Sequence, residues 1–292
     1  MRMTSALDSR NYDGVFVYQR GSQTDSMRII HRHDGRGSRE RLYSLSGSAR
    51  EVIRDGETVT CIFPDDRAVM VEQGRTKRLF PSAFVAPAGD LASNYELTVA
   101  GEDRVAGRSA WLVTIRPRTP DRYGYRLWID VESDLLLKSN VLDPGGFVLE
   151  QFMFTQLDLP AAIADDLLKP ATSGEGFERI ARQSGQEAPP VPAGQWEARW
   201  LPAGFSLRDH ADQPVAGNAG PVRHLVYSDG LAMVSIFVEP VVDGKPTLRG
   251  FSSMGAVNAF STVADAWQVT VVGEVPRATV QRIATEVVLR GK

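Results

Sequence analysis

Alternating apolar and polar positions between Tyr123 and Leu157 organise the first half of this chain. From Tyr123 to Ile129, every second side chain is large and apolar or aromatic. A period of two indicates a half-buried strand, because successive side chains point to opposite faces of a sheet. Two more apolar runs follow, at 135–142 and 147–157, and the turn between them reads Asp-Pro-Gly-Gly. The stretch predicts three consecutive antiparallel strands with one apolar face that must be covered.

The same alternation predicts further antiparallel strands nearer the N-terminus. Short strands are expected at 14–18, 27–31, 42–45, 51–53, 58–62, 68–71, 95–99 and 110–115. Asp55-Gly56 is expected to form the tight turn of one hairpin. A short helix is expected from Met3 to Asn11, and a loop or short helix at 80–91 could lie over the sheet.

The pattern changes after Leu157, where two short helices are expected at 160–163 and 177–180. The proline-rich run 188–194 is typical of a semi-rigid linker. We therefore expect an N-terminal domain at 1–170, a linker at 171–195 and a smaller domain at 196–292. In the smaller domain, a hairpin crosses 228–230, a second strand pair spans 256–272, and apolar residues recur at helical spacing after Pro276. The expected fold class is mainly β (α+β).

Composition is that of an ordinary soluble globular chain of 292 residues, with 42% hydrophobic and 24% charged residues. The net charge of −3 gives no general attraction to nucleic acid. No apolar run is long enough to span a bilayer. Cys61 is the single cysteine, so no internal disulfide can form, and we expect it to be a small buried hydrophobe.

Catalytic and metal-binding signatures are missing from the sequence. There is no Gly-x-Ser-x-Gly elbow, no His-Glu-x-x-His and no phosphate-binding loop in the required context. His31 and His33 could supply half a metal site, but zinc needs three or four ligands, and a partly exposed strand end is the preferred interpretation. We expect no enzyme, no catalytic residue, no metal and no cofactor.

Two features could nevertheless carry a binding function. The first is an arginine-rich stretch, 28–54, with seven arginines against three acidic residues; it is either a solvated surface or a site for phosphate or carboxylate groups. The second is a surplus of aromatic residues on a sheet with few helices to cover it. These residues either fill a core or line a hollow for an acyl chain or an apolar peptide. They are Phe16, Tyr18, Trp111, Tyr125, Trp128, Phe152 and Phe154.

Several motifs in register, spread over both halves, resemble the RseB/MucB family of envelope-stress regulators. The N-terminal ones are 12–18, 39–42, 50–52, 122–130, 136–139 and 149–152, and the C-terminal ones are 200–205, 227–231 and 271–276. The segment 240–255 matches no motif, and its role is open. The resemblance covers nearly the whole chain.

This resemblance implies a periplasmic protein with a LolA/LolB-like unclosed β-barrel, covering helices, and a smaller C-terminal domain. It implies binding to the periplasmic segment of an RseA/MucA-type anti-sigma factor, which blocks the first proteolytic cut. It further implies that lipopolysaccharide or lipoprotein acyl chains loosen the complex. The sequence opens Met1-Arg2-Met3-Thr4 without the apolar segment of a signal peptide, so the expected periplasmic location rests on the family alone.

From these implications we expect two binding regions. Partner contacts are assigned to Trp200, Leu201, Phe205, Tyr227 and Phe237, since aromatic residues are effective binding centres. The acyl chain is assigned to the seven aromatic residues of the N-terminal domain, and its phosphates to Arg28, Arg32 and Arg41. A lipid or lipoprotein carrier of LolA/LolB type is the alternative function, and homodimer formation and the identity of the lipid are left open.

Overall fold

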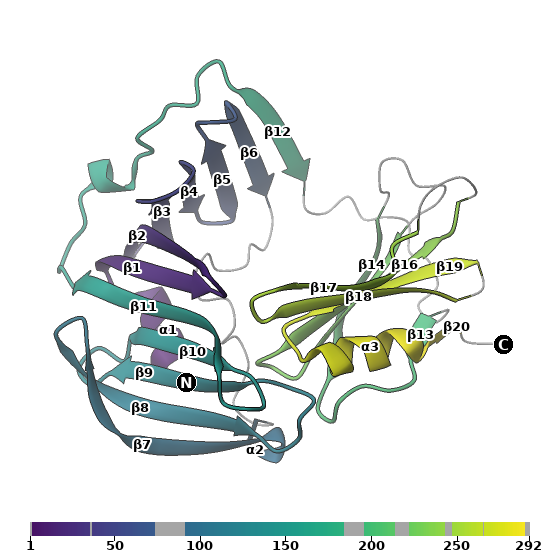
Figure 1. Ribbon diagram of the computed structural model, residues 1–292. Coiled ribbons are helices and arrows are strands. Elements are labelled where there is room, and N and C mark those ends of the chain that lie inside the picture. The colour runs from purple at the N-terminus through teal and green to yellow at the C-terminus, as the bar shows by residue number, and fades with distance from the viewer. Residues whose placement is uncertain are drawn as a thin grey trace.

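The computed structural model describes residues 2–35, 37–73, 91–183, 196–213, 222–242, 247–264 and 266–289. Among these residues, a 12-stranded sheet forms the N-terminal domain, and a six-stranded sheet with a two-stranded ribbon forms the C-terminal domain. Figure 1 shows the large sheet running from β7 to β12, with the smaller domain beyond one end of its middle strands. The expected loop at 80–90 and most of the proline-rich linker lie outside the described residues.

The N-terminal domain begins with one helix and then consists almost entirely of strands. Its elements are α1 (Arg2–Ser9), β1 (Tyr12–Arg20), β2 (Gln23–Asp34), β3 (Gly37–Ser44), β4 (Glu51–Asp55), β5 (Thr58–Phe63), β6 (Ala68–Gln73), α2 (Leu91–Asn94), β7 (Tyr95–Val105), β8 (Arg108–Pro117), β9 (Gly124–Asp130), β10 (Leu136–Leu142), β11 (Val148–Asp158), η1 (Asp165–Leu168) and β12 (Glu178–Gln183). The three strands expected from 123–157 are confirmed as β9, β10 and β11.

The large sheet is open. Its strand order is β12-β6-β5-β4-β3-β2-β1-β11-β10-β9-β8-β7, so β7 and β12 end the sheet without pairing to each other. All neighbours are antiparallel except β12, which runs parallel to β6. The expected unclosed barrel is confirmed, with α1 the longest helix described in this domain.

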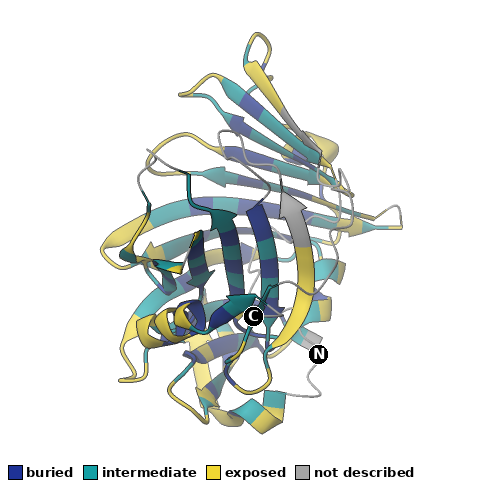
Figure 2. Cartoon of the chain, turned by 90° about the vertical axis from the view of Figure 1, so that its right-hand side faces the viewer, coloured by how far each residue is buried: buried dark blue, intermediate teal, exposed yellow. Residues whose placement is uncertain are grey.

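Residues on one face of the sheet form a core together with α1. Ala6 and Leu7 of the helix pack with strand residues such as Phe16 and Ile29, and α1 lies behind β1, β11 and β10 in Figure 1. A second cluster around Tyr95, Tyr125 and Leu136 lies toward the smaller domain. Figure 2 shows buried segments in the middle of both sheets and exposed ones at the loops.

Two expected helices are wrong. Residues 160–163 are not helical, and a single 3₁₀ turn, η1, follows them. The carbonyls of Ile163 and Leu167 accept hydrogen bonds from Arg32 and Arg41, so the segment is held as an irregular crossing over β2–β4. Residues 178–183 form β12 instead of a helix, because the open edge of β6 offers backbone pairing to this short segment. Part of the expected linker therefore belongs to the large sheet.

The C-terminal domain packs a sheet against one helix. Its elements are β13 (Trp196–Ala198), β14 (Ser206–Gln213), β15 (Val222–Ser228), β16 (Met233–Pro240), β17 (Gly250–Met254), β18 (Val257–Ala264), β19 (Trp267–Gly273), α3 (Arg277–Thr285) and β20 (Val287–Leu289). The sheet order is β14-β15-β16-β19-β18-β17. The expected C-terminal helix is confirmed but ends at Thr285, and the following valines pair with β13 instead. Val280 and Ile283 of α3 are fully buried against Val269 and Val271.

Candidate functional site

A buried ion pair joins the two domains. Arg122, just before β9, places Nη1 2.6 Å from Oδ2 of Asp229, in the β15–β16 loop, and the two side chains are 1% and 0% exposed. The Tyr95 hydroxyl, at the start of β7, donates to the same Oδ2 at 2.8 Å. Burial and the Asp229 charge raise the pKa of Tyr95 well above its usual value. The second Asp229 oxygen accepts the backbone N–H groups of Leu231 and Ala232. The carboxylate thus fixes its own loop and the N-terminal domain at once.

The Arg122 guanidinium is enclosed by further groups from both domains. Its Nη2 donates to the carbonyl of Ala203. Its central carbon lies 5.3 Å from the ring centre of Tyr95 and 5.4 Å from that of Phe205. Leu231, next to the ion pair, packs into the N-terminal cluster that contains Tyr125. A buried charge is tolerated only when it is paired and hydrogen-bonded, and this one is held on several sides.

A second contact is made by the turn between β17 and β18. Oε1 of Glu150, at the start of β11, accepts the backbone N–H of Ala256 at 2.8 Å, and its Oε2 accepts the Tyr18 hydroxyl. Gly255 has φ +61°, and a Cβ there would clash with Arg20 Cγ and Glu150 Oε1. Only glycine fits this approach.

A carboxyl of the smaller domain lies in the same electrostatic surroundings. Burial raises the pKa of Glu274, and the charge of Glu150 raises it further. Burial also raises the pKa of Tyr18, with its hydrogen bond to Glu150 as the next cause. The seam therefore disfavours additional negative charge at this point.

A third contact ties the edge of α3 and β18 to the segment before β9. Asn258 Nδ2 donates to the Tyr123 hydroxyl and to the carbonyl of Val275, both at 2.8 Å. The Thr279 hydroxyl donates to the carbonyl of Asp121 at 2.9 Å. Together the three contacts form a directional, mostly polar seam between the two domains.

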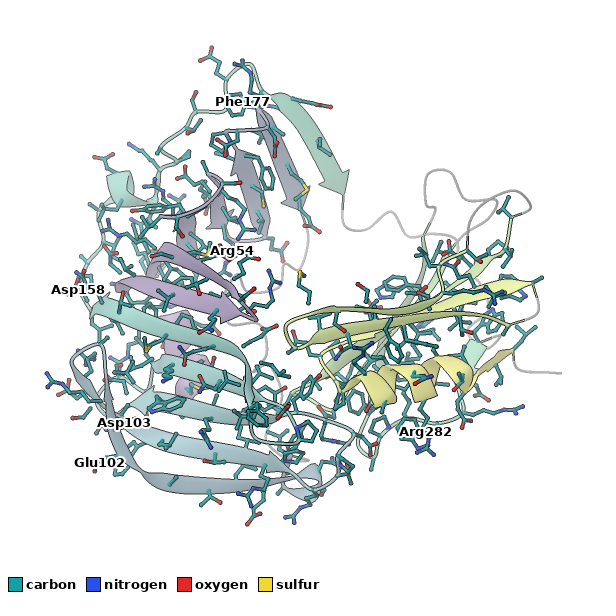
Figure 3. All side chains as sticks on the ribbon, viewed as in Figure 1. Arg54, Glu102, Asp103, Asp158, Phe177 and Arg282 are labelled. Atoms are coloured by element: carbon teal, nitrogen blue, oxygen red, sulfur yellow. The ribbon has the colours of Figure 1, made fainter. Side chains whose placement is uncertain are left out.

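The five side chains expected to contact a partner lie largely in the core of the smaller domain. Tyr227 is buried, and Trp200, Leu201 and Phe205 are half-buried against the same cluster. Arg282 lies 3.8 Å from the centre of the Trp200 ring on the outer side of α3 (Figure 3). Phe237 is different, because it points away from the core beside Ile236 and stacks on His224 at 4.3 Å. Residue type alone did not show which of these side chains pack on the core and which lie on the other face of the sheet.

Most of the aromatic residues expected to hold an acyl chain are also buried. Phe16, Phe152 and Phe154 pack edge to face with ring centres 5.0–6.0 Å apart. Tyr125 and Trp128 are buried, and the Trp128 indole donates to Asp103, which is labelled at the end of the β7–β8 hairpin in Figure 3. Tyr18 is half-buried beside Glu150. These six side chains fill core or seam space in this structure.

The face that remains open is near β7. Trp111, the seventh aromatic residue, is 40% exposed, and Leu97 and Val99 are 49% and 63% exposed. Leu97 and Val99 pair with Ile115 and Val113, so they share a face with the cluster around Tyr125. The sequence pattern predicted β7 as a strand but gave no sign that its apolar side chains are exposed.

The three arginines assigned to phosphates each hold a carboxylate of this chain. Arg28 pairs with Asp13 at 2.7 Å, Arg32 with Asp165 at 2.5 Å, and Arg41 with Glu51. The hydrogen bond between Asp13 and Arg28 is the main cause that raises the pKa of that guanidinium. Arg32 and Arg41 also hold the irregular crossing segment. Any phosphate would have to compete with these carboxylates.

The described part of the chain has no arrangement of side chains suited to a metal ion. No group of three or more His, Cys, Asp or Glu side chains comes together there. The expected partly exposed strand end is wrong for His31, which is buried, shares a hydrogen bond at Nδ1 with the Arg10 carbonyl, and stacks on Tyr12; His33 is exposed. Cys61 is half-buried at the edge of the N-terminal core, and burial raises the pKa of its thiol. Among the described helices, none is long and apolar enough to cross a membrane.

Models for the MucB/RseB N-terminal domain and the MucB/RseB C-terminal domain match residues 1–172 and 190–288. The sigma factor AlgU regulatory protein MucB of Pseudomonas aeruginosa is 36% identical over 294 residues, which cover 98% of this chain and 88% of MucB. This chain belongs to the MucB/RseB family. The sigma-E factor regulatory protein RseB of Haemophilus influenzae is 31% identical over 293 residues, which cover 99% of this chain and 90% of that RseB.

Solved MucB/RseB-family structures are similar over the whole chain. MucB in complex with MucA(peri) has 33% identity and a TM-score of 0.78, covering 100% of this chain and 97% of that one. A further crystal structure of MucB has 34% identity and a TM-score of 0.67, covering 98% of this chain and 94% of that one. The structure of this chain is therefore more similar to that of MucB in complex with MucA(peri) than to this further MucB structure.

Proposed function

We propose that this chain is a regulatory binding protein of the periplasm. It binds the periplasmic segment of an anti-sigma factor of the MucA or RseA type and shields that segment from the first proteolytic cut. The observation that carries the proposal is the full-length similarity to MucB in complex with MucA(peri). The names of its relatives also describe regulatory proteins.

The seam between the domains supports this function physically. A binding protein that recognises its partner with two domains needs a defined arrangement between them, and the Arg122–Asp229 pair supplies one. The partner is expected to be unstructured when free and to order on binding. Of the five residues expected to contact it, Phe237 is half-buried on the face of the sheet away from the core, whereas Trp200, Leu201, Phe205 and Tyr227 belong to or pack on the core of the smaller domain.

The binding test uses the full-length protein and the periplasmic segment of Pseudomonas aeruginosa MucA. Isothermal titration calorimetry is expected to show saturable, equimolar binding with a dissociation constant of roughly micromolar or tighter. A negative heat-capacity change is expected, because apolar surface is buried. An absence of heat and of co-migration in gel filtration would refute the proposal.

Lipid is proposed as the ligand that weakens this complex. The open apolar face of Leu97, Val99 and Trp111 supplies a contact surface for an acyl chain. If lipid and anti-sigma segment favour different domain arrangements, each weakens the other by the same factor, as linkage requires. Titrating lipopolysaccharide into the preformed complex is expected to release the segment, and an unchanged affinity would exclude lipid control.

A lipid or lipoprotein carrier is the second candidate function, and the same open face favours it. A carrier, however, needs only the N-terminal domain, whereas here a second domain is fixed by a buried ion pair. Organic extraction followed by mass spectrometry separates the two. Stoichiometric lipid in protein that does not bind the MucA segment would favour the carrier.

A further inference from the structure

The two large sheets present four edge strands, and one of them is unlike the others. β7 carries Glu96, Glu102, Asp103 and Arg104; β12 carries Glu178 and Arg179; and β14 carries Arg208 and Asp209. β17 reads Gly-Phe-Ser-Ser-Met and has no charge and no proline. Natural proteins protect exposed edges with charges, prolines or a covering segment, because an open edge pairs with any extended chain.

Nothing covers β17 among the described residues. It pairs with β18 alone and ends the sheet order. Residues 251–254 are all exposed, with Phe251 at 39% and Met254 at 56%. Leu248, just before the strand, is 64% exposed. An apolar, uncharged edge that faces solvent is suited to bind an added strand.

The side chains of β17 divide between the two faces of the sheet. Phe251 pairs with Phe260, which packs on the core beneath α3, so Phe251 lies on that face. Met254 pairs with Val257 and points to the opposite face from Phe251, as its odd spacing requires. An added strand would therefore meet one apolar side chain on each face.

Charge near Gly250 and Phe251, at the first end of β17, is positive, whereas Glu150 lies beside Gly255 at the other end. The Arg277 guanidinium stacks 4.4 Å from the centre of the Phe251 ring, and Arg277 and Arg249 are both exposed. An acidic residue beside an apolar one would match this surface, since carboxylates pair well with arginine forks. The edge also continues directly into the seam, because Gly255 and Ala256 follow β17 and contact Arg20 and Glu150.

We propose that β17 is the docking edge for an extended segment of the MucA-type partner. The segment adds as a further strand beside β17, with alternating apolar side chains and an acidic residue near Arg277. The backbone of about five residues supplies the hydrogen bonds, and Phe251 and Met254 supply the selectivity. This inference rests on the proposed function and assigns a place to one part of the partner.

Hydrogen–deuterium exchange on the unmodified protein tests the strand addition. The probe is the periplasmic segment of Pseudomonas aeruginosa MucA. On binding, amides in 250–254 are expected to exchange at least about tenfold more slowly, whereas those of β7 stay unchanged. Binding without any slowing in β17 would overturn the docking edge and leave the proposed function intact.

A pair of matched variants tests the same edge by affinity. Met254→Glu places a charge on β17, and Ile180→Glu places the same charge on a comparably exposed apolar position of β12, another edge strand. Met254→Glu is expected to weaken binding by about tenfold or more, and Ile180→Glu by less than about twofold. Equal affinities of the two variants would overturn the inference. If the wild-type protein fails to bind the segment at all, the proposed function fails and takes this inference with it.

Discussion

At the scale of single residues, Asp229 binds two side chains of the other domain, Arg122 and Tyr95. Its second oxygen accepts backbone N–H groups of its own loop, whereas Arg122 and Tyr95 are far from it in the sequence. The family motifs that contain Arg122 and Asp229 can be recognised in the sequence. The sequence does not show that these two side chains pair with each other. An ion pair across two domains leaves no periodic signal in a sequence.

Replacing Asp229 by Asn is expected to lower the free energy of unfolding by about 3–5 kcal/mol, because Arg122 then stays buried without its counter-charge. The amide oxygen can still accept the loop N–H groups, so the loss reports the seam. Urea unfolding measures it. The control is Asp166→Asn, which removes an exposed pair with Lys169 and is expected to leave the unfolding free energy nearly unchanged. Similar losses in the two variants would contradict a special role for the seam.

The buried His31 is expected to make stability depend on pH. Burial lowers its pKa from 6.5 to about 4, so the folded protein keeps the imidazole neutral where the unfolded chain would protonate it. Its contribution is complete above pH 6.5 and is lost as the pH falls toward about 4. Over that window the loss is on the order of 3 kcal/mol, at about 1.4 kcal/mol for each pKa unit.

The control for this pH dependence is His31→Phe, which keeps a ring against Tyr12 but cannot titrate. Denaturant unfolding of both proteins is measured at several pH values. The range runs from about pH 4 to about pH 7.5, which is about one unit above the ordinary pKa of histidine. The unfolding free energy of the wild type minus that of His31→Phe is expected to decrease as the pH falls, because only the wild type loses the contribution of His31. A difference that does not change with pH would show that His31 titrates alike in both states.

At the scale of elements, the β17–β18 turn is the most demanding piece of local geometry. Gly255 has both a positive φ and close neighbours in the other domain, whereas Gly146 has φ +87° and nothing within 4 Å of the place where a Cβ would lie. Both Gly255→Ala and Gly146→Ala are expected to lower the free energy of unfolding by roughly 1–2 kcal/mol, because alanine is strained in the left-handed region. Gly255→Ala is expected to lower it further, because its Cβ would also clash with the other domain. Thermal unfolding gives the energies, and small-angle scattering is expected to show a larger radius of gyration for Gly255→Ala alone. Matching behaviour of the two variants would contradict close docking of this turn.

Sequence patterns predicted strands well and short helices poorly. Strands β9 to β11 bury one face each, so apolar residues alternate with polar ones along them. This alternation can be recognised from a few consecutive residues. The run at 178–183 is equally compatible with helix and strand, and only the free edge of β6 decided it. Likewise, aromatic type marked Phe152 and Tyr227 as binding candidates, while the packing of sheet against helix made both of them core.

At the scale of the whole molecule, the two sheets are joined by a seam of a few directional contacts. Two crystal structures of MucB, one of them in complex with MucA(peri), match this chain with TM-scores of 0.67 and 0.78 respectively for the MucB structure and the complex. The polar contacts at Asp229, Glu150 and Asn258 are the bonds that a change of domain arrangement would have to exchange. We therefore expect domain arrangement to be coupled to partner binding and, through linkage, to lipid.

Shielding of the partner is tested most directly by the rate at which a protease cuts it. The periplasmic segment of Pseudomonas aeruginosa MucA is digested with subtilisin, alone and with an equimolar amount of this protein, and intact segment is followed by mass spectrometry. Cleavage is expected to slow by about tenfold or more in the complex, because the protease cuts the free segment and binding lowers the concentration of that free form. A segment that binds but is cut as fast as when free would contradict a shielding function.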